Sequence, residues 1–275
     1  MANKYNSVLT YYGGKQRMLP LILNRIPPHK TYVEPFVGGG SVFFNINPSA
    51  CMVMDDINGN LANFYRQVQT NFESVWRLVE HTLHDEHTYK HARDIYYRRT
   101  PGTDIERAWA VWVGSTMSFG GSLFDGSFQI TTNTVDTSHP GRTTQTKKKY
   151  LKIACQRLKN AMILEKDALE VIKKYNTGHV FIYLDPPYVE GTDGKKVRQG
   201  HYQNLKYSQK DFENLIDIIT ESKSKILLSS YQNEYLDKSG LIIENHKLPL
   251  TVNTKSGYKI EVLSRNYELQ NTLFQ

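Results

Sequence analysis

The chain has few cysteines, no long apolar run and no apolar segment in its first six residues, and each absence argues against a class of protein. It carries two cysteines, Cys51 and Cys155, in 275 residues. Two are too few for a disulfide framework, so we expect a reducing, cytoplasmic setting. No apolar run approaches the ~20 residues of a membrane span, and the first six residues lack the apolar core of a secretory signal. We therefore expect no membrane partner.

What the chain has instead is a basic charge balance. Its 34 Lys and Arg residues exceed its 27 Asp and Glu residues, and the net charge is +7. This excess suits a polyanionic partner, but it is spread over many residues and does not identify one. The length permits one elaborated domain, or one domain with a sizeable insertion.

Short apolar runs alternate with stretches of helical periodicity, as at Asn58–Leu83 and in the helix that Ser208 begins. This alternation predicts a mostly parallel sheet with helices on both faces, followed by an antiparallel hairpin at 241–269. The alternation breaks between about 82 and 149, where we expect an insertion or small second domain. The predicted strands are 31–34, 51–54, 162–164, 180–184 and 225–228.

The most informative motif is Asp185-Pro186-Pro187-Tyr188, which directly follows the apolar run 180–184. In open α/β sheets the chemistry lies at the carboxyl ends of the strands. The two prolines fix the backbone and remove two N–H donors. A carboxylate, a free carbonyl and an aromatic ring then suit a planar group with an exocyclic amine, such as adenine.

A glycine turn, Glu34-Pro35-Phe36-Val37-Gly38-Gly39-Gly40-Ser41, follows the first strand. It lacks the Gly-Lys-Ser/Thr ending of a P-loop, and Phe43 stands where a dinucleotide fingerprint has its third glycine. A nucleoside without a pyrophosphate, such as S-adenosylmethionine, remains. Asp56, at the end of the next strand, is placed to accept both ribose hydroxyls. Taken singly, the glycines also fit a tight turn and Asp56 a helix N-cap.

Together these motifs resemble the DNA adenine-N6 methyltransferase family in its α arrangement, the D12 class of bacteria and phages. The cofactor motif comes first, a recognition insertion second and the catalytic Asp-Pro-Pro-Tyr last, about 150 residues after Glu34. The resemblance implies a Rossmann-like, seven-stranded methyltransferase fold. It also implies a catalytic domain formed by residues 1–60 and 150–275, with a mainly helical target-recognition domain at 61–149.

The resemblance assigns roles to individual residues. Tyr11 and Lys15 lie in an aromatic-x-Gly-Gly-Lys motif that holds the amino-acid end of the cofactor, and Asp167 matches an acid near its adenine, although Ala168 replaces the usual aromatic. The catalytic set is Asp185, Pro186, Pro187 and Tyr188. The cofactor set is Tyr11, Lys15, Glu34, Phe36, Gly38, Gly40, Ser41, Asp56, Asp167 and Asp185.

Methyl transfer from a sulfonium donor requires no metal. We expect Asp185 and the Pro186 carbonyl to accept the two N6 hydrogens of an adenine flipped out of double-stranded DNA, while Tyr188 stacks on the base. We expect a monomer or weak dimer. Phosphate contacts are expected from the basic residues in or beside the insertion and after the catalytic motif: Arg98, Arg99, Arg142, Lys147, Lys148, Lys149, Lys195, Lys196 and Arg198.

Two rival functions remain at this stage: an RNA adenine-N6 methyltransferase of the same fold, and a non-catalytic DNA-binding module. A metal site among His81, His84, His87 and His91 is disfavoured because the segment is otherwise polar and has no partner cysteines. Trp76, Trp109 and Trp112 are interpreted as core residues.

The recognition sequence is expected to differ from GATC, or the selectivity to be weak. Members of the family that methylate GATC carry an arginine- and asparagine-rich recognition stretch, whereas 115–128 here is rich in Gly, Ser and Phe. Thr10 stands where those enzymes place a base-reading lysine.

Overall fold

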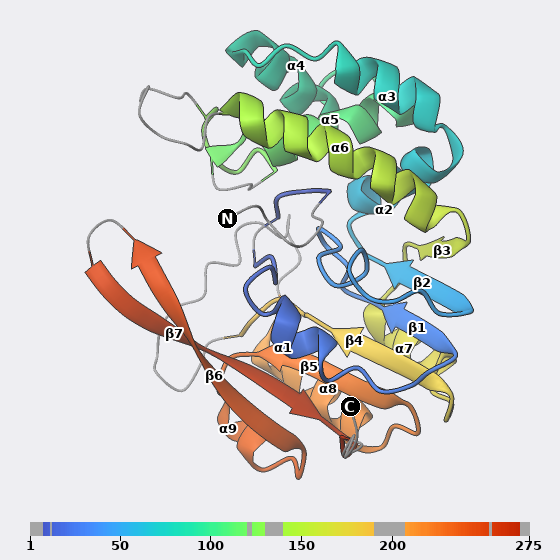
Figure 1. Ribbon diagram of the computed structural model, residues 1–275, viewed down its shortest axis with the longest axis vertical. Coiled ribbons are helices and arrows are strands. Elements are labelled where there is room, and N and C mark those ends of the chain that lie inside the picture. Colours follow the sequence, from blue (N-terminus) through green and yellow to red (C-terminus); the bar gives the residue numbers. More distant parts are fainter. Residues whose placement is uncertain are drawn as a thin grey trace. The chain divides into compact units, whose positions relative to one another are not determined.

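The computed structural model describes residues 8–11, 13–119, 123–129, 140–189, 207–252 and 255–269. Its strands form one seven-stranded sheet in the order β3-β2-β1-β4-β5-β7-β6 (Figure 1). The strands are β1 Thr31–Glu34, β2 Cys51–Asp55, β3 Ala161–Leu164, β4 Val180–Leu184, β5 Lys225–Ser230, β6 Ile242–Val252 and β7 Lys255–Arg265.

The five strands predicted from apolar runs are all present, and the centre of the sheet is parallel. Val33 of β1 pairs with Val53 of β2 and with Ile182 of β4, and Ile182 pairs in turn with Ile226 of β5. All five residues of β4 are buried, as expected of a parallel strand covered on both faces. The sequence therefore predicted the α/β class and the parallel central strands correctly.

The predicted terminal hairpin is also confirmed. β6 and β7 pair antiparallel from Ile242 opposite Arg265 to Val252 opposite Lys255. β7 also pairs antiparallel with β5. The antiparallel strand β7 thus lies directly beside β5, which is the parallel neighbour of the strand that precedes the Asp-Pro-Pro-Tyr motif.

The chain divides into two compact units: Met1–Gln16, Val37–Ile46 and Asp56–Glu165 form the first, and Arg17–Phe36, Asn47–Asp55 and Lys166–Gln275 form the second. The predicted boundaries of a recognition insertion at 61–149 stay a prediction. The helices are α1 Leu19–Leu23, α2 Gly59–Thr70, α3 Phe72–Glu80, α4 Glu86–Tyr96, α5 Asp104–Met117, α6 Pro140–Leu158, α7 Ala168–Lys174, α8 Gln209–Thr220 and α9 Glu234–Asp237.

The first unit is built around α5, which packs against α2, α3, α4 and α6. Thr103 and Glu106 form a reciprocal capping box at the start of α5, and this pair satisfies two otherwise orphan N–H groups. Every residue from Ala108 to Met117 is buried. The periodic stretch 58–83 is two helices rather than one, because Asn71 leaves the helical conformation between α2 and α3.

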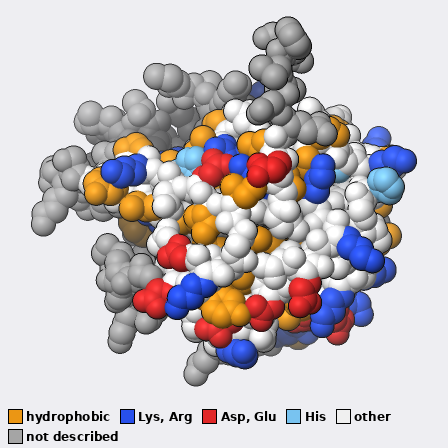
Figure 2. All heavy atoms as spheres, turned by 90° about the horizontal axis from the view of Figure 1, so that it is seen from below, with side chains coloured by type: hydrophobic (Ala, Val, Ile, Leu, Met, Phe, Trp, Pro, Cys, Tyr) orange, Lys and Arg blue, Asp and Glu red, His pale blue; other side chains and the backbone are white. Residues whose placement is uncertain are grey.

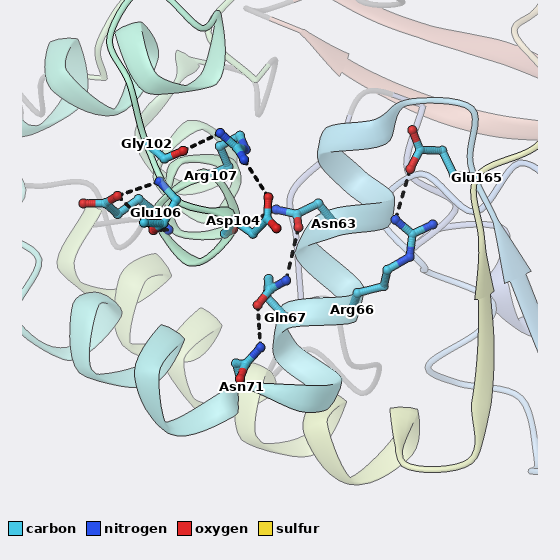
Figure 3. Close-up of polar contacts among 10 residues, drawn as sticks. Asn63, Arg66, Gln67, Asn71, Gly102, Asp104, Glu106, Arg107 and Glu165 are labelled. Carbon is cyan, nitrogen blue, oxygen red and sulfur yellow. Dashed lines mark hydrogen bonds and ion pairs between the residues drawn. The ribbon is translucent and has the colours of Figure 1, made fainter.

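Side-chain amides and an ion pair fix α2 in the first unit (Figure 3). The Asn63 amide donates to the backbone carbonyl of Asp104 over 2.8 Å, and this bond ties α2 to the start of α5. Arg66 forms an ion pair of 3.0 Å with Glu165, which follows β3. Gln67 continues the chain of amides from Asn63 toward the C-terminal end of α2. These contacts set the direction of α2, whose N-terminus follows the Asp55-Asp56 pair.

In the second unit, α8 begins with the cap that its sequence predicts. Ser208 and Asp211 form a capping box at the start of α8, as expected. At the base of the hairpin, Glu244 pairs with both Arg25 and Arg265, so the negative charge of this partly buried acid is balanced by two cations.

On the face shown in Figure 2, acidic and basic side chains are interspersed. Among the described residues, no helix is both long and apolar enough to cross a bilayer.

Candidate active site

The Asp-Pro-Pro-Tyr tetrapeptide begins at the residue after β4. The two neighbours of β4 in the sheet, β1 and β5, run parallel to it. The three strands therefore direct their carboxyl ends to one edge of the sheet. Pro186 is buried, whereas Asp185 and Tyr188 are half-buried. The motif is therefore held by the sheet and remains partly accessible.

The hydroxyl of Tyr188 is hydrogen-bonded inside the second unit. It donates to Glu261 Oε2 of β7 over 2.8 Å. The Tyr188 ring also meets that of Tyr231 edge to face, with ring centroids 4.4 Å apart. Burial and the carboxylates of Asp185 and Glu261 raise the pKa of Tyr188 well above its ordinary value. The phenol therefore keeps its proton and acts as a donor.

Two further predicted residues of the second unit lie at the end of β1. Glu34 is buried and accepts a hydrogen bond of 2.6 Å from the Tyr32 hydroxyl. The rings of Phe36 and Tyr207 meet edge to face, with their centroids 6.3 Å apart. Burial, then the carboxylates of Asp211 and Asp167, raise the pKa of Tyr207. Tyr207 is an aromatic neighbour that the sequence did not single out.

The glycine turn of the first unit packs tightly against Tyr11. A Cβ added at Gly38 would lie 3.0 Å from the Tyr11 ring, and one at Gly39 would lie 2.8 Å from Tyr11 Cβ. Gly38 and Gly40 have φ values of 47° and 69°, in the left-handed region that side chains disfavour. The turn therefore needs glycine both for its backbone and for its contact with Tyr11.

Asp56 joins this turn to the start of α2. One carboxylate oxygen accepts the Gly38 N–H over 2.9 Å and the other accepts the Asn58 N–H over 2.9 Å. Burial raises the pKa of Asp56 to about 6, although both N–H donors oppose the change. The N-cap of α2 is Asn58, so the alternative reading of Asp56 as the helix cap is not what the structure shows.

Lys15 and Ser41 complete the predicted residues of the first unit. Lys15 is 5% exposed, and its ammonium donates to the Gly13 carbonyl over 2.7 Å. Gly14 closes the preceding turn by donating to the Tyr11 carbonyl. Ser41 is buried directly after the glycine turn. Tyr11, Lys15, Gly38, Gly40, Ser41 and Asp56 thus all belong to the first unit.

Asp167 has a local role in the second unit. Its carboxylate caps α7 by accepting the backbone N–H groups of Leu169 and Glu170. Such a cap is worth about 1 kcal/mol. Asp167 is exposed, and Ala168 behind it is buried. The predicted contact of Asp167 with the adenine of a cofactor stays a prediction.

The basic residues proposed for phosphate contact differ in exposure. Arg98, Arg99 and Lys149 are exposed, and Lys148 donates to the Glu80 carbonyl. Lys147 differs, because it is 7% exposed and burial lowers its pKa to about 8. The expectation that Lys147 reaches a phosphate does not fit this burial. The side chain of Arg142 and all of Lys195, Lys196 and Arg198 lie outside the described residues.

The histidines of 81–91 make separate local contacts. His84 lies beside Phe128, and His91 lies beside Trp109. Within the described ranges, no group of three or more His, Cys, Asp or Glu residues is placed to hold a metal.

The core interpretation holds for Trp109 and Trp112 but is wrong for Trp76. Trp112 is fully buried and Trp109 is 9% exposed. Trp76 is half-buried at the surface of α3, where it stacks on Phe72 and lies under the Lys152 ammonium at 4.2 Å. Helical spacing alone cannot separate an inward face from one that a lysine stem covers.

Comparison with known proteins supports one interpretation of this arrangement. The type II methyltransferase M1.LlaDCHI of Lactococcus lactis subsp. cremoris is 25% identical over 93% of both chains. The type II methyltransferase M.MjaIII of Methanocaldococcus jannaschii is 27% identical over 66% of this chain and 68% of its own. The DNA N-6-adenine-methyltransferase of Escherichia phage P1 is 25% identical over 82% of this chain, which matches 29% of that longer protein.

A family model described as the D12 class N6 adenine-specific DNA methyltransferase matches residues 11–248. The match begins at Tyr11 and includes the glycine turn, Asp56 and the Asp-Pro-Pro-Tyr motif. It confirms the resemblance drawn from these motifs, and the chain therefore belongs to the D12 class of N6 adenine-specific DNA methyltransferases.

Proposed function

We propose that this chain transfers a methyl group from S-adenosylmethionine to N6 of an adenine that has been flipped out of double-stranded DNA. The observation that carries the proposal is the position of Asp185-Pro186-Pro187-Tyr188 at the end of the fully buried strand β4. The sheet holds the motif rigidly, as a catalytic constellation requires.

The residues of the first unit fit a nucleoside with a charged amino-acid tail. Asp56 has a carboxylate that is already desolvated and fixed by two backbone donors, and such a group suits the two ribose hydroxyls. The buried Lys15 ammonium suits the carboxylate of the amino-acid end. The donor is a sulfonium whose methyl group is already activated, so no metal is needed for the transfer.

On the base side, the chemical difficulty is the nucleophile. The N6 lone pair of adenine is delocalised into the ring. Asp185 and the Pro186 carbonyl accept its two hydrogens, favour a pyramidal nitrogen and stabilise the positive charge that develops there. Tyr188 stacks on the base. Asp185 need not be a strong base, because the proton can leave after the methyl group has been transferred.

A base within a duplex cannot reach such a motif, so the target nucleotide must be extruded at a cost of a few kcal/mol. We assign the offsetting phosphate contacts to exposed basic residues of the helical segment: Arg98, Arg99 and Lys149, with Lys148 beside them. We further propose that residues 61–149 form the recognition part of the enzyme. The C-terminal part of α5 is buried and cannot contact a base edge. We therefore assign base reading to the residues that follow α5.

The test is substitution of the catalytic carboxylate. Asp185→Ala is expected to abolish labelled-methyl transfer to duplex DNA while cofactor affinity, measured by calorimetry, stays within a few-fold of wild type. Residual transfer above a few per cent of wild type would contradict the mechanism. Structured RNA offered in parallel separates the RNA alternative, and absence of cofactor binding by the wild type would favour a non-catalytic module.

A further inference from the structure

Tyr188 of the catalytic motif is hydrogen-bonded to Glu261, which lies on a strand far away in the sequence. Tyr188 and Tyr231 follow the parallel strands β4 and β5, whereas Lys259 and Glu261 lie on β7. Ser230 of β5 pairs with Val262 of β7, and continuation of this register places Tyr231 opposite Glu261. Strand pairing therefore brings Glu261 to the edge of the sheet where the motif lies.

Glu261 is buried but fully engaged. Its side chain is 7% exposed, and one oxygen lies 2.6 Å from the Lys259 ammonium while the other accepts the Tyr188 hydroxyl. An unpaired carboxylate at this depth would be costly. Each of its oxygens therefore has a partner, one in Lys259 and the other in Tyr188.

Lys259 also contacts the two aromatic rings. Its ammonium lies 4.6 Å from the centre of the Tyr231 ring and 5.8 Å from that of Tyr188. Burial alone would lower the pKa of Lys259, but the Glu261 carboxylate and Tyr231 outweigh it and the net pKa is raised. The lysine therefore stays charged beside Glu261.

Two contacts restrict the Tyr188 ring. The hydrogen bond to Glu261 fixes the position of its hydroxyl, and the edge-to-face contact with Tyr231 fixes the plane of the ring, with an interplanar angle of 74°. Stacking on an aromatic ring stabilises an extruded base, and a ring that is already oriented loses less entropy when the base arrives.

We propose that Glu261 is a positioning residue for the methyl transfer, acting through the Tyr188 hydroxyl to hold the stacking ring in place for the extruded adenine, with Lys259 and Tyr231 as its supports. The inference rests on the proposed function and adds to it a group outside the catalytic motif. Glu261 does not touch the base in this scheme, and its effect passes entirely through Tyr188.

The test is a double-mutant cycle on the methylation of duplex DNA at saturating cofactor. Tyr188→Phe keeps the ring and removes the hydroxyl, and Glu261→Ala removes the acceptor. Each single variant is expected to lower kcat/KM for DNA by roughly tenfold, the scale of one hydrogen bond to a charged group. The double variant is expected to lose no more than either single one, because both break the same contact.

Two further variants separate positioning from general stability. Glu261→Gln keeps an oxygen that can accept the Tyr188 hydroxyl and is expected to recover most of the activity. Ile260→Thr changes the adjacent, exposed residue of β7 and is expected to leave kcat/KM unchanged. Cofactor affinity of Tyr188→Phe is expected to match wild type, which a general loss of structure would not explain.

The outcomes are distinct. Wild-type activity in Tyr188→Phe, or additive losses in the double variant, would overturn the positioning role while the methyltransferase assignment stands. A wild-type protein that methylates no DNA at all would overturn the proposed function and this inference with it.

Discussion

Asp56 accepts a hydrogen bond from the backbone N–H of Gly38 across 2.9 Å, and this bond joins the glycine turn to the start of α2. The ribose hydroxyls of a nucleoside donate hydrogen bonds, so they require the carboxylate form of Asp56. Because the pKa of this group is raised to about 6, cofactor affinity is expected to be constant above pH 7 and to fall by about tenfold per pH unit below 6. Calorimetric titration between pH 5 and 8 measures it.

The matched variant is Asp56→Asn, which keeps the size and one acceptor oxygen but cannot titrate. Its affinity is expected to be lower at pH 8 and flat across the same range. A wild-type profile that is equally flat would remove Asp56 from the cofactor site.

Asp56 affects folding with the opposite sign. Its folded pKa of about 6 exceeds the ordinary 3.8, so its favourable contribution is present below about pH 4 and is lost as the pH rises through 6. The free energy of unfolding of the cofactor-free chain, measured in urea, is therefore expected to decline across this window relative to Asp56→Asn. Parallel pH profiles for the two proteins would contradict the raised pKa.

Gly40 tests whether the turn needs glycine for packing as well as for its backbone. Gly40 and Gly240 both have positive φ, at 69° and 75°, but only at Gly40 would a Cβ meet another group, the Phe44 ring at 2.5 Å. Gly240→Ala is expected to cost about 1–2 kcal/mol in unfolding free energy. Gly40→Ala is expected to cost a further ~1–3 kcal/mol from overpacking. Equal losses in urea titrations would mean that the ring moves aside freely.

The parallel core of the sheet was predictable because its strands are apolar on both faces. The runs at 31–34 and 180–184 could be read directly, and the terminal hairpin followed from two β-rich segments around a turn. The break in the 58–83 stretch was not predictable from periodicity, since Leu61, Val68 and Val75 keep helical spacing through Asn71. Only the backbone conformation of Asn71 shows that one helix ends there.

The candidate site was predictable where it is local in sequence. Asp185 to Tyr188 and the glycine turn are each read within a few residues. Glu261 and Tyr231 were missed because their contacts with Tyr188 depend on the register between β5 and β7, and this register cannot be deduced from the sequence. The period-2 alternation of β7, with Glu261 buried and Ile260 exposed, is the signal that could have suggested an inward acid.

Two neighbouring lysines of α6 separate surface charge from buried charge. Lys149 is exposed, whereas Lys147 is 7% exposed. Lys149→Ala is expected to weaken duplex binding and to reduce the slope of log K against log salt concentration by about 0.9, one phosphate contact. Lys147→Met, which keeps the length of the side chain, is expected to leave that slope unchanged. Fluorescence anisotropy across a salt series measures both, and the reverse ranking would contradict the assignment.

The recognition sequence is expected to differ from GATC. The backbone N–H of Thr10 donates to Ser115 Oγ over 2.7 Å, and Ser115 is 2% exposed. The Ser115 hydroxyl therefore ties the N-terminal segment to α5 and is not available to a base edge. Thr10, which replaces the lysine expected of GATC enzymes, lacks the long donor that reaches guanine. Both positions thus carry short side chains, and the backbone of one is bonded to the hydroxyl of the other.

Sequence-resolved detection of N6-methyladenine on a random duplex pool measures this directly. We expect methylated adenines in a motif other than GATC, or in a broad set of contexts, with the same pattern for wild type and Thr10→Ser because both side chains are short hydroxyls without the long donor of a lysine. Catalytically inactive Asp185→Ala, treated in parallel, sets the background. Modification confined to GATC would show that other residues supply the missing donors and would refute the expectation.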